Sequence, residues 1–211
     1  MKERHIRFSG PMVRAILEGK KTMTRLVISK KYGEIKKVIE SSLIRGEFHI
    51  IGTNGQSYYA ICPYGLLGNR LWVKETFRLF DRTDECGCVA EFCQCPKDGA
   101  VIFRATGDDG ESKWKPSTFM PRWASRILLE IVDVRIERLQ DISEEDAERE
   151  GIDCCDFDQS LVLDMANKLN QPIEDSRPWF AALWDGINGK AQSKCWDANP
   201  WVWAIEFKRI N

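Results

Sequence analysis

Apolar and polar positions recur in short blocks along this chain, and each block predicts a short element. Residues 5–8 alternate and are followed by Ser-Gly-Pro, which predicts a strand that ends at a turn. Apolar residues then recur at helical spacing over 12–18, so we expect a helix that ends at Gly19. The chain therefore opens with a strand, a turn and a helix.

Further blocks follow in the middle and at the end of the chain. Residues 71–77 alternate in part and predict a strand, whereas the branched residues of 127–139 predict either a strand pair or one long bent strand. Ser143 with the acids after it predicts a capped helix that ends at Gly151. Two last elements are an amphipathic helix over 178–187 and an alternating strand over 201–207.

Short strands separated by two or three helices favour an α+β fold, in the form of a small mixed β-barrel with helices at its ends. A parallel sheet built of βαβ units is disfavoured because long helices are missing between the strands. No linker marks a boundary, so we expect a single domain over 1–211. The segments 78–118 and 152–178 are interpreted as insertions in it.

Composition narrows the class of protein. The 211 residues (24.3 kDa) are 43% hydrophobic and include eight Trp, which excludes a disordered or collagen-like chain. The apolar runs are too short to span a membrane, and the N-terminus lacks the apolar stretch of a signal peptide. We therefore expect a cytoplasmic protein without a membrane partner.

Charge is unevenly distributed although the formal net charge is only -1. Residues 1–37 contain eleven Lys or Arg against three Glu, whereas 141–175 contain twelve Asp or Glu against two Lys or Arg. The first segment is suited to contact phosphates and the second is not. The alternative is that both are ordinary solvated surfaces.

The densest group of reactive side chains lies between Gly19 and Arg25. Lys21 and Thr24 are three residues apart, a spacing that brings them onto one face of a helix or tight turn. A Thr hydroxyl becomes a nucleophile when a base removes its proton, and a Lys serves as that base when desolvation or positive neighbours such as Lys20 favour its neutral form. The alternative is a basic turn that caps the preceding helix.

Three separated segments resemble the ASCH domain, a PUA-like barrel. They are 16–25 (ILEGKKTMTR), 68–75 (GNRLWVKE) and 147–151 (AEREG), in that order. The chain is most similar to the longer ASCH proteins of phages and prophages, and the resemblance covers nearly the whole chain. The other segments that are similar to these proteins are 62–65, 120–126 and 196–201.

The resemblance implies a PUA-like barrel and two classes of function. PUA-like domains mostly bind RNA, and a group of small bacterial ASCH proteins removes the acetyl group from N(4)-acetylcytidine with a Lys, a Thr and a Glu. By motif these fall on Lys21, Thr24 and Glu150. Thr24 would attack the acetyl carbonyl, neutral Lys21 would accept its proton, and Glu150 would orient the Lys or position a water. Unlike in those enzymes, Arg25 follows Thr24 directly.

Two carboxylates are thus candidates for the site. Glu150 has the alternative of an exposed acid at a helix end. Glu75 alternates with Val73 and lies either on a solvated strand face or at the mouth of the barrel. In the second case Glu75 would supplement or replace Glu150.

Four cysteines form a C-x-C-x4-C-x-C pattern at Cys86, Cys88, Cys93 and Cys95. Four thiolates this close complete a tetrahedral zinc site, and a small insertion without a core of its own would gain its fold from the metal. Such a zinc is structural, because four Cys ligands leave no position for water. Free thiols and disulfides are the alternatives. No organic cofactor is expected.

The segment 113–126 interleaves basic and aromatic residues. Arg122, Trp123 and Arg126 are candidates for stacking on bases and contacting a nucleic-acid backbone, together with Lys20 and Arg25. The alternative for each ring is that it fills the core.

These patterns predict a protein that recognises RNA, another nucleic acid or a nucleoside, with amidohydrolase activity on an acylated cytidine as one form of that function. A non-catalytic RNA-binding accessory module of a phage or prophage is the alternative from another class. A ribonuclease, in which Lys21 stabilises the phosphorane, is the third. A phage-encoded protein would act in the cytoplasm of its bacterial host.

Overall fold

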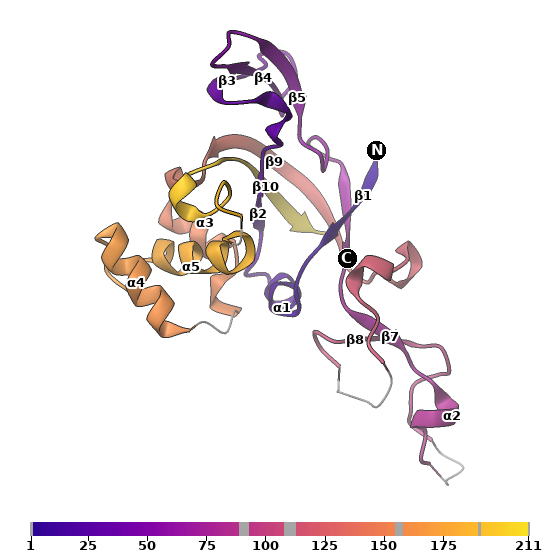
Figure 1. The fold of residues 1–211 in the computed structure, drawn as a ribbon. Coiled ribbons are helices and arrows are strands. Elements are labelled where there is room, and N and C mark those ends of the chain that lie inside the picture. Colours follow the sequence, from indigo (N-terminus) through magenta and orange to yellow (C-terminus); the bar gives the residue numbers. More distant parts are fainter. Residues whose placement is uncertain (1, 89–92, 108–112, 155–157, 190, 211) are drawn as a thin grey trace.

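A curved five-stranded sheet forms the centre of the molecule (Figure 1). The computed structural model describes residues 2–88, 93–107, 113–154, 158–189 and 191–210. The strand order is β1-β6-β9-β10-β2, with β1 parallel to β6 and the other pairs antiparallel. The strands are β1 (Glu3–Arg7), β2 (Met23–Val27), β6 (Arg70–Lys74), β9 (Leu128–Arg138) and β10 (Trp201–Arg209).

The two edge strands of this sheet, β1 and β2, are neighbours along the chain. Helix α1 (Gly10–Leu17) connects them, so the chain passes from one edge of the sheet to the other. Pro11 lies in the first turn of α1, where its missing N–H costs nothing, and Val13 and Ile16 are buried. Within the described residues no ladder joins β1 to β2.

The main core packs one face of the central sheet against α1 and a second sheet. Leu71 and Val73 of β6 alternate with outward residues, and the fully buried Ile205 of β10 belongs to the same core cluster. Phe48 and Ile50 belong to the same cluster and come from the second sheet. That sheet consists of β3 (Ile35–Glu40), β4 (Glu47–Gly52) and β5 (Ser57–Ile61).

Three helices gather on one side of the central sheet (Figure 1). They are α3 (Glu144–Arg149), α4 (Gln159–Leu169) and α5 (Ser176–Asn188). Each begins at a cap whose side chain accepts a backbone N–H, namely Ser143, Asp158 and Asp175. Around α5 a second core forms, which includes Phe180, Trp184 and Trp196.

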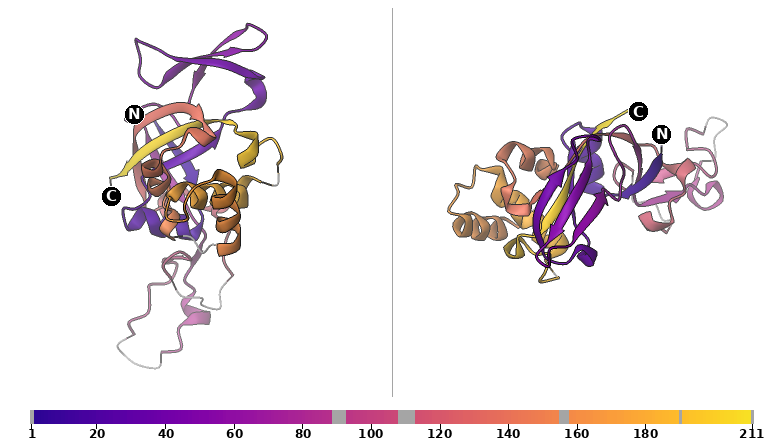
Figure 2. Two further views of the ribbon diagram at one scale, coloured as in Figure 1. Left: turned by 90° about the vertical axis from the view of Figure 1, so that its left-hand side faces the viewer. Right: turned by 90° about the horizontal axis from the view of Figure 1, so that it is seen from above.

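Two parts project from the central body in different directions (Figure 2). One is the sheet β3–β5, and the other is an arm that contains β7 (Phe77–Leu79), α2 (Arg82–Glu85) and β8 (Val101–Phe103). We call this second part, over the described residues between 77 and 103, the cysteine arm. Short 3-10 turns complete the structure at Lys30–Tyr32, Ser117–Phe119, Arg122–Ala124, Leu139–Asp141, Ile152–Cys154 and Trp196–Ala198.

The α+β class predicted from the sequence is confirmed, and several predicted elements need correction. The strand expected over 71–77 is confirmed as β6 for residues 71–74, but it ends at Lys74, and β7 begins at Phe77 in a different sheet. Of the two alternatives for 127–139, the single long strand is confirmed, as β9 (Leu128–Arg138). The segment 152–178, predicted to be an insertion, contains α4 and the start of α5. Residues 89–92, 108–112 and 155–157 of the two predicted insertions lie outside the described residues.

No described helix combines the length and the apolar character that crossing a bilayer requires.

Candidate functional site

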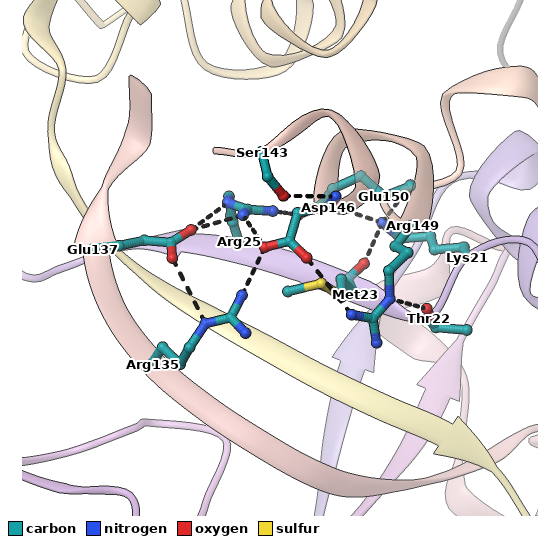
Figure 3. A network of polar contacts seen from close by, with 10 residues as sticks. All are labelled: Lys21, Thr22, Met23, Arg25, Arg135, Glu137, Ser143, Asp146, Arg149 and Glu150. Carbon is teal, nitrogen blue, oxygen red and sulfur yellow. Dashed lines mark hydrogen bonds and ion pairs between the residues drawn. The ribbon is translucent and has the colours of Figure 1, made fainter. Parts of the chain in front are cut away.

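Lys21 is fully buried, and its ammonium group is surrounded by oxygen atoms (Figure 3). Its Nζ donates to the backbone oxygens of Met23 and Glu150 and to Oε2 of Glu150, each at 2.8 Å. The ring of Phe8 lies on another side, 5.5 Å away. Three N–H donors thus meet three acceptors, which is the arrangement that makes a buried ammonium tolerable.

The chain places Lys21 at this point through two turns. Gly19 has a φ of +76°, and the N–H groups of Lys20 and Lys21 both donate to Ala15 at the end of α1. On the other side Gly151 ends α3 with a φ of +78°, and a Cβ there would lie 2.8 Å from Cβ of Lys21. The end of α1, the start of β2 and the end of α3 therefore meet at Lys21.

The carboxylate of Glu150 joins Lys21 to Arg25. Its Oε2 accepts from Lys21, and its Oε1 accepts from Nη1 of Arg25 at 3.0 Å. Arg25 also donates to Glu137 of β9 and to Asp146 of α3, so its buried guanidinium faces three carboxylates (Figure 3). Two cations and three carboxylates thereby lock β2, β9 and α3 together.

The electrostatics of Arg25 follow from this geometry. Burial alone lowers the pKa of a guanidinium, but the charges of Glu150 and Glu137 and their hydrogen bonds outweigh burial and raise the pKa of Arg25. Arg25 is therefore a permanent cation in the wall of the site. Its guanidinium also lies over the ring of Phe180, at 5.5 Å.

A pocket of about 750 Å3 opens beside this cluster. It lies between the two edge strands of the central sheet and is closed by α1 and α5. Thr24, Arg25 and Glu150 supply polar lining, whereas Phe180 and Trp184 supply apolar lining. Its other lining residues are Ile6, Arg7, Phe8, Ser9, Pro11, Met12, Leu26, Tyr64, Leu183, Ile187 and Asn188. A mostly apolar pocket with a few convergent polar groups is the usual form of a small-ligand site.

The structure brings Lys21 and Glu150 into contact and puts Thr24 and Glu150 in one pocket. The expectation that Lys21 and Thr24 share a helical or tight-turn face is wrong, because residues Met23–Val27 form the strand β2. The alternative of an exposed Glu150 is also wrong, since this residue is buried at the C-terminus of α3.

Glu75 is buried at a separate place. Its two carboxylate oxygens each accept from Arg126 at 3.0 Å, and the guanidinium of Arg126 covers the ring of Phe103 at 4.0 Å. Glu75 therefore forms a two-point ion pair and does not line the pocket of Glu150. The guanidinium of Arg126, a predicted substrate-binding residue, is thus engaged in the ion pair with Glu75.

The remaining predicted contact residues lie at the surface. Lys20 is exposed and forms an ion pair with Glu18 at 3.1 Å. Arg122 is ion-paired with Glu3 at 3.0 Å, and the ring of Trp123 is 68% exposed. The core-filling alternative is therefore wrong for Trp123.

The contacts of Lys21 limit what it can do chemically. With all three N–H groups donating, Lys21 has no lone pair to accept a proton from Thr24. It gains one only if a proton passes first to Glu150, its ion-pair partner. In the described arrangement the buried, mutually paired charges of the cluster are best suited to hold the pocket wall in place.

Sequence reasoning missed the acids that complete the cluster. Glu137 stands in an alternating strand, and Asp146 lies in the first turn of a capped helix, where acids are common without any site. The rings of Phe180 and Trp184 belong to the second core as well as to the pocket, so an apolar pattern alone does not mark them as site residues. The acid-rich segment 141–175 includes Asp146 but not Glu137, and nothing in its local pattern indicates that it pairs with Arg25.

The four cysteines of the arm form a compact cluster. The sulfur atoms of Cys86, Cys88, Cys93 and Cys95 all lie within 4.8 Å of one another. Cys86 and Cys93 are 3.4 Å apart, and Cys88 and Cys95 are 3.5 Å apart. Tetrahedral coordination with Zn–S bonds of about 2.3 Å requires S–S separations of about 3.8 Å. The cluster is thus compatible with a bound metal ion.

Comparison of this chain with protein families, curated proteins and solved structures finds no match.

Proposed function

We propose that this protein is a PUA-like ASCH protein that recognises a nucleobase, as part of a nucleoside or a nucleic acid, in the pocket between β1, β2, α1 and α5. The observation that carries the proposal is the composition of the pocket wall. Aromatic and aliphatic side chains offer a surface for a flat ring, while Thr24 offers a hydroxyl for its edge. The ion-paired carboxylate of Glu150 and the fully buried Arg25 support this part of the wall. The ASCH-like segments of the sequence support the same class.

The edge strands β1 and β2 are not hydrogen-bonded to each other within the described residues, and the pocket lies between them. This arrangement is consistent with a PUA-like barrel that is open at this point. In this proposal β1 and β2 are the two sides of a barrel that α1 spans, and the pocket is its mouth. The ion-paired cluster then sits at the base of the mouth, where water is excluded and polar contacts gain specificity.

Calorimetry with cytidine, N(4)-acetylcytidine and uridine tests this proposal. Ile187 and Leu163 are exposed aliphatic residues on the neighbouring helices α5 and α4, and only Ile187 lines the pocket. Ile187→Asp should weaken nucleoside binding about five- to tenfold, since it removes roughly 1 kcal/mol of apolar contact. Leu163→Asp is the matched control. Equal effects of the two variants, or no binding by the wild type, would overturn the proposal.

Hydrolysis of an acylated cytidine is the second candidate, because Thr24 shares the pocket with Glu150. Oγ of Thr24 would form a bond to the acetyl carbon while the bond to N4 breaks, and the hydroxyl proton would end on the departing amine. Water would then release acetate from Thr24. Since the Lys21 amine donates three hydrogen bonds, this route requires a prior proton transfer from Lys21 to Glu150.

The two threonines of the segment allow a matched test of hydrolysis. Thr22 accepts a hydrogen bond from Nε of Arg149 at 3.2 Å and does not line the pocket, unlike Thr24. If Thr24 is the nucleophile, Thr24→Val abolishes release of cytidine from N(4)-acetylcytidine, Thr24→Ser retains part of it, and Thr22→Val retains most of it. Cleavage of single-stranded RNA in the same assay would instead favour the ribonuclease, and no turnover would leave recognition alone.

We further propose that the metal compatible with the cysteine cluster is a structural zinc held by Cys86, Cys88, Cys93 and Cys95. Four soft thiolates within reach of one tetrahedral ion favour zinc, and among the described residues of the arm only a small apolar cluster at its base stabilises it. Elemental analysis of protein purified without chelator should find about one zinc per chain. Cys88→Ser should lose the zinc, whereas Cys195→Ser, outside the cluster, should keep it. Metal-free wild-type protein would favour free thiols.

A further inference from the structure

The outer face of β1 and β6 carries a row of basic and aromatic side chains. Ile6 and Val73 point into the core, so the residues that alternate with them point outward. The parallel register pairs these outward residues directly across the two strands. They are Glu3 beside Arg70, His5 beside Trp72, and Arg7 beside Lys74. We call this the β1–β6 outer face.

Trp72 is the centre of this face. The ring of His5 lies 5.6 Å from it, the ammonium of Lys74 lies 5.3 Å from it, and the guanidinium of Arg122 lies 6.0 Å from it. Cations above an aromatic ring hold their position and keep their charge available to an anion. The face therefore combines ordered positive charge with an aromatic surface.

The segment 113–126 folds against this face and adds two exposed rings. Thr118 anchors it, because its backbone oxygen accepts from Lys74 at 2.7 Å and its hydroxyl accepts from Arg7 at 3.4 Å. The neighbouring rings of Phe119 and Trp123 are 72% and 68% exposed. Two large rings presented to solvent beside a basic row are unusual for a solvated surface, where aromatic side chains normally bury most of their area.

The outer face is continuous with the pocket. Arg7 lines the pocket and also donates to Thr118, so it belongs to both. A ligand long enough to extend out of the pocket past Arg7 would therefore reach Lys74, Trp72 and the two exposed rings.

We propose that the β1–β6 outer face, with Phe119 and Trp123, binds the strand of a single-stranded nucleic acid whose neighbouring base occupies the pocket. This inference rests on the proposed function and names its ligand as a polynucleotide rather than a free nucleoside. Bases stack on Phe119 and Trp123, and phosphates contact Arg7, Lys74 and Arg122. Glu3 is the only carboxylate of the paired row, so the charge of the face is complementary to phosphate.

Fluorescence anisotropy with a labelled single-stranded pyrimidine RNA of about 12 nucleotides tests the inference. Phe119→Ala and Trp123→Ala should each weaken RNA binding about 5- to 100-fold, the range found when a stacking ring is removed. Tyr59→Ala is the matched control, because this ring is 54% exposed but lies on β5. The ratio of the RNA and nucleoside dissociation constants, measured on the same preparations, should rise only in the first two variants.

A second pair of variants tests the phosphate contacts. Arg122 and Arg45 are both exposed and both ion-paired with one carboxylate, but only Arg122 belongs to the proposed surface. Arg122→Gln should reduce the slope of log K against log salt by about 0.7, whereas Arg45→Gln should leave it unchanged.

The outcomes separate this inference from the function on which it rests. Wild-type protein that binds nucleoside but not RNA, or ring variants that bind RNA as the wild type does, would overturn the inference alone. RNA binding that depends on the rings without nucleoside binding would overturn the pocket proposal and leave the surface. A wild-type dimer that Trp123→Ala converts to a monomer with unchanged RNA affinity would show that the face joins two copies of the chain.

Discussion

At the scale of single residues, the site depends on charges that are buried together. Lys21 and Arg25 are both removed from water, and burial of an unpaired cation costs several kcal/mol. Glu150 contacts both cations, and Glu137 and Asp146 contact Arg25, so every buried charge has a partner. Removal of one member leaves its partners buried without compensation. The cluster is therefore sensitive to single substitutions in a way that surface ion pairs are not.

The first prediction uses two adjacent lysines. Lys21→Met removes a fully buried ammonium and leaves Glu150 with only Arg25, so we expect a loss of about 3–5 kcal/mol in the free energy of unfolding. Lys20→Met changes an exposed side chain and should stay within about 0.5 kcal/mol of the wild type. Urea denaturation followed by tryptophan fluorescence measures both. A tolerated Lys21→Met would mean that the cluster adds little to stability and that Lys21 is retained for another reason.

At the scale of elements, turns bring the cluster together more than helices or strands do. Gly151 reverses the chain after α3 so closely to Lys21 that a methyl group has no room, with Cβ of Ala15 also 2.9 Å from its position. The sequence predicted this end of α3 correctly from Ser143 and Gly151. It failed at β2, since the short strand Met23–Val27 carries Thr24 and Arg25 and lacks the regular apolar alternation by which strands are recognised.

Two glycines with the same backbone conformation test how closely the end of α3 packs against Lys21 and Ala15. Gly151 and Gly55 both have a φ of +78°, but a Cβ at Gly55, between β4 and β5, would meet nothing within 4 Å. Gly55→Ala therefore carries only the cost of the left-handed backbone, about 1 kcal/mol. Gly151→Ala carries the same backbone cost plus displacement of Lys21 and Ala15, and should lose at least about 1–3 kcal/mol more. Chemical denaturation of the two variants gives the difference, and equal losses would contradict the packing of α1 and β2 against α3.

At the scale of the whole molecule, the central sheet and its helices contain the pocket, while the cysteine arm and the sheet β3–β5 project from them (Figure 2). The succession of short strands and a few helices made the fold class predictable, and the absence of sustained periodicity over 78–118 indicated the region of the arm. The sheet β3–β5 was not predictable from the sequence. Large apolar residues such as Ile39 and Tyr59 are exposed on it, so polar and apolar positions do not alternate clearly between its exposed and buried faces. The pairing of Arg25 with Glu137 joins residues 112 positions apart, a distance over which local patterns carry no information.

The last prediction is that the cysteine arm is a module separable from the pocket. Phe80 and Ala100 are joined at its base, where the Phe80 N–H donates to the oxygen of Ala100 at 2.8 Å, and Leu79 pairs with Val101. Replacement of 81–99 by Asn-Gly, the preferred two-residue hairpin turn, should preserve this pairing. Arg78 loses its buried partner Glu85 in this variant, so Arg78→Met accompanies the deletion.

The shortened protein should bind no zinc, unfold in one cooperative transition, and bind nucleosides as the wild type does. The physical reason is that the arm contributes none of the residues of the two large cores and none of those that line the pocket. Thermal unfolding followed by circular dichroism, together with nucleoside calorimetry, measures both properties. If the shortened chain folds but no longer binds nucleosides, the arm takes part in the site, and the metal would then control the pocket as well as the arm.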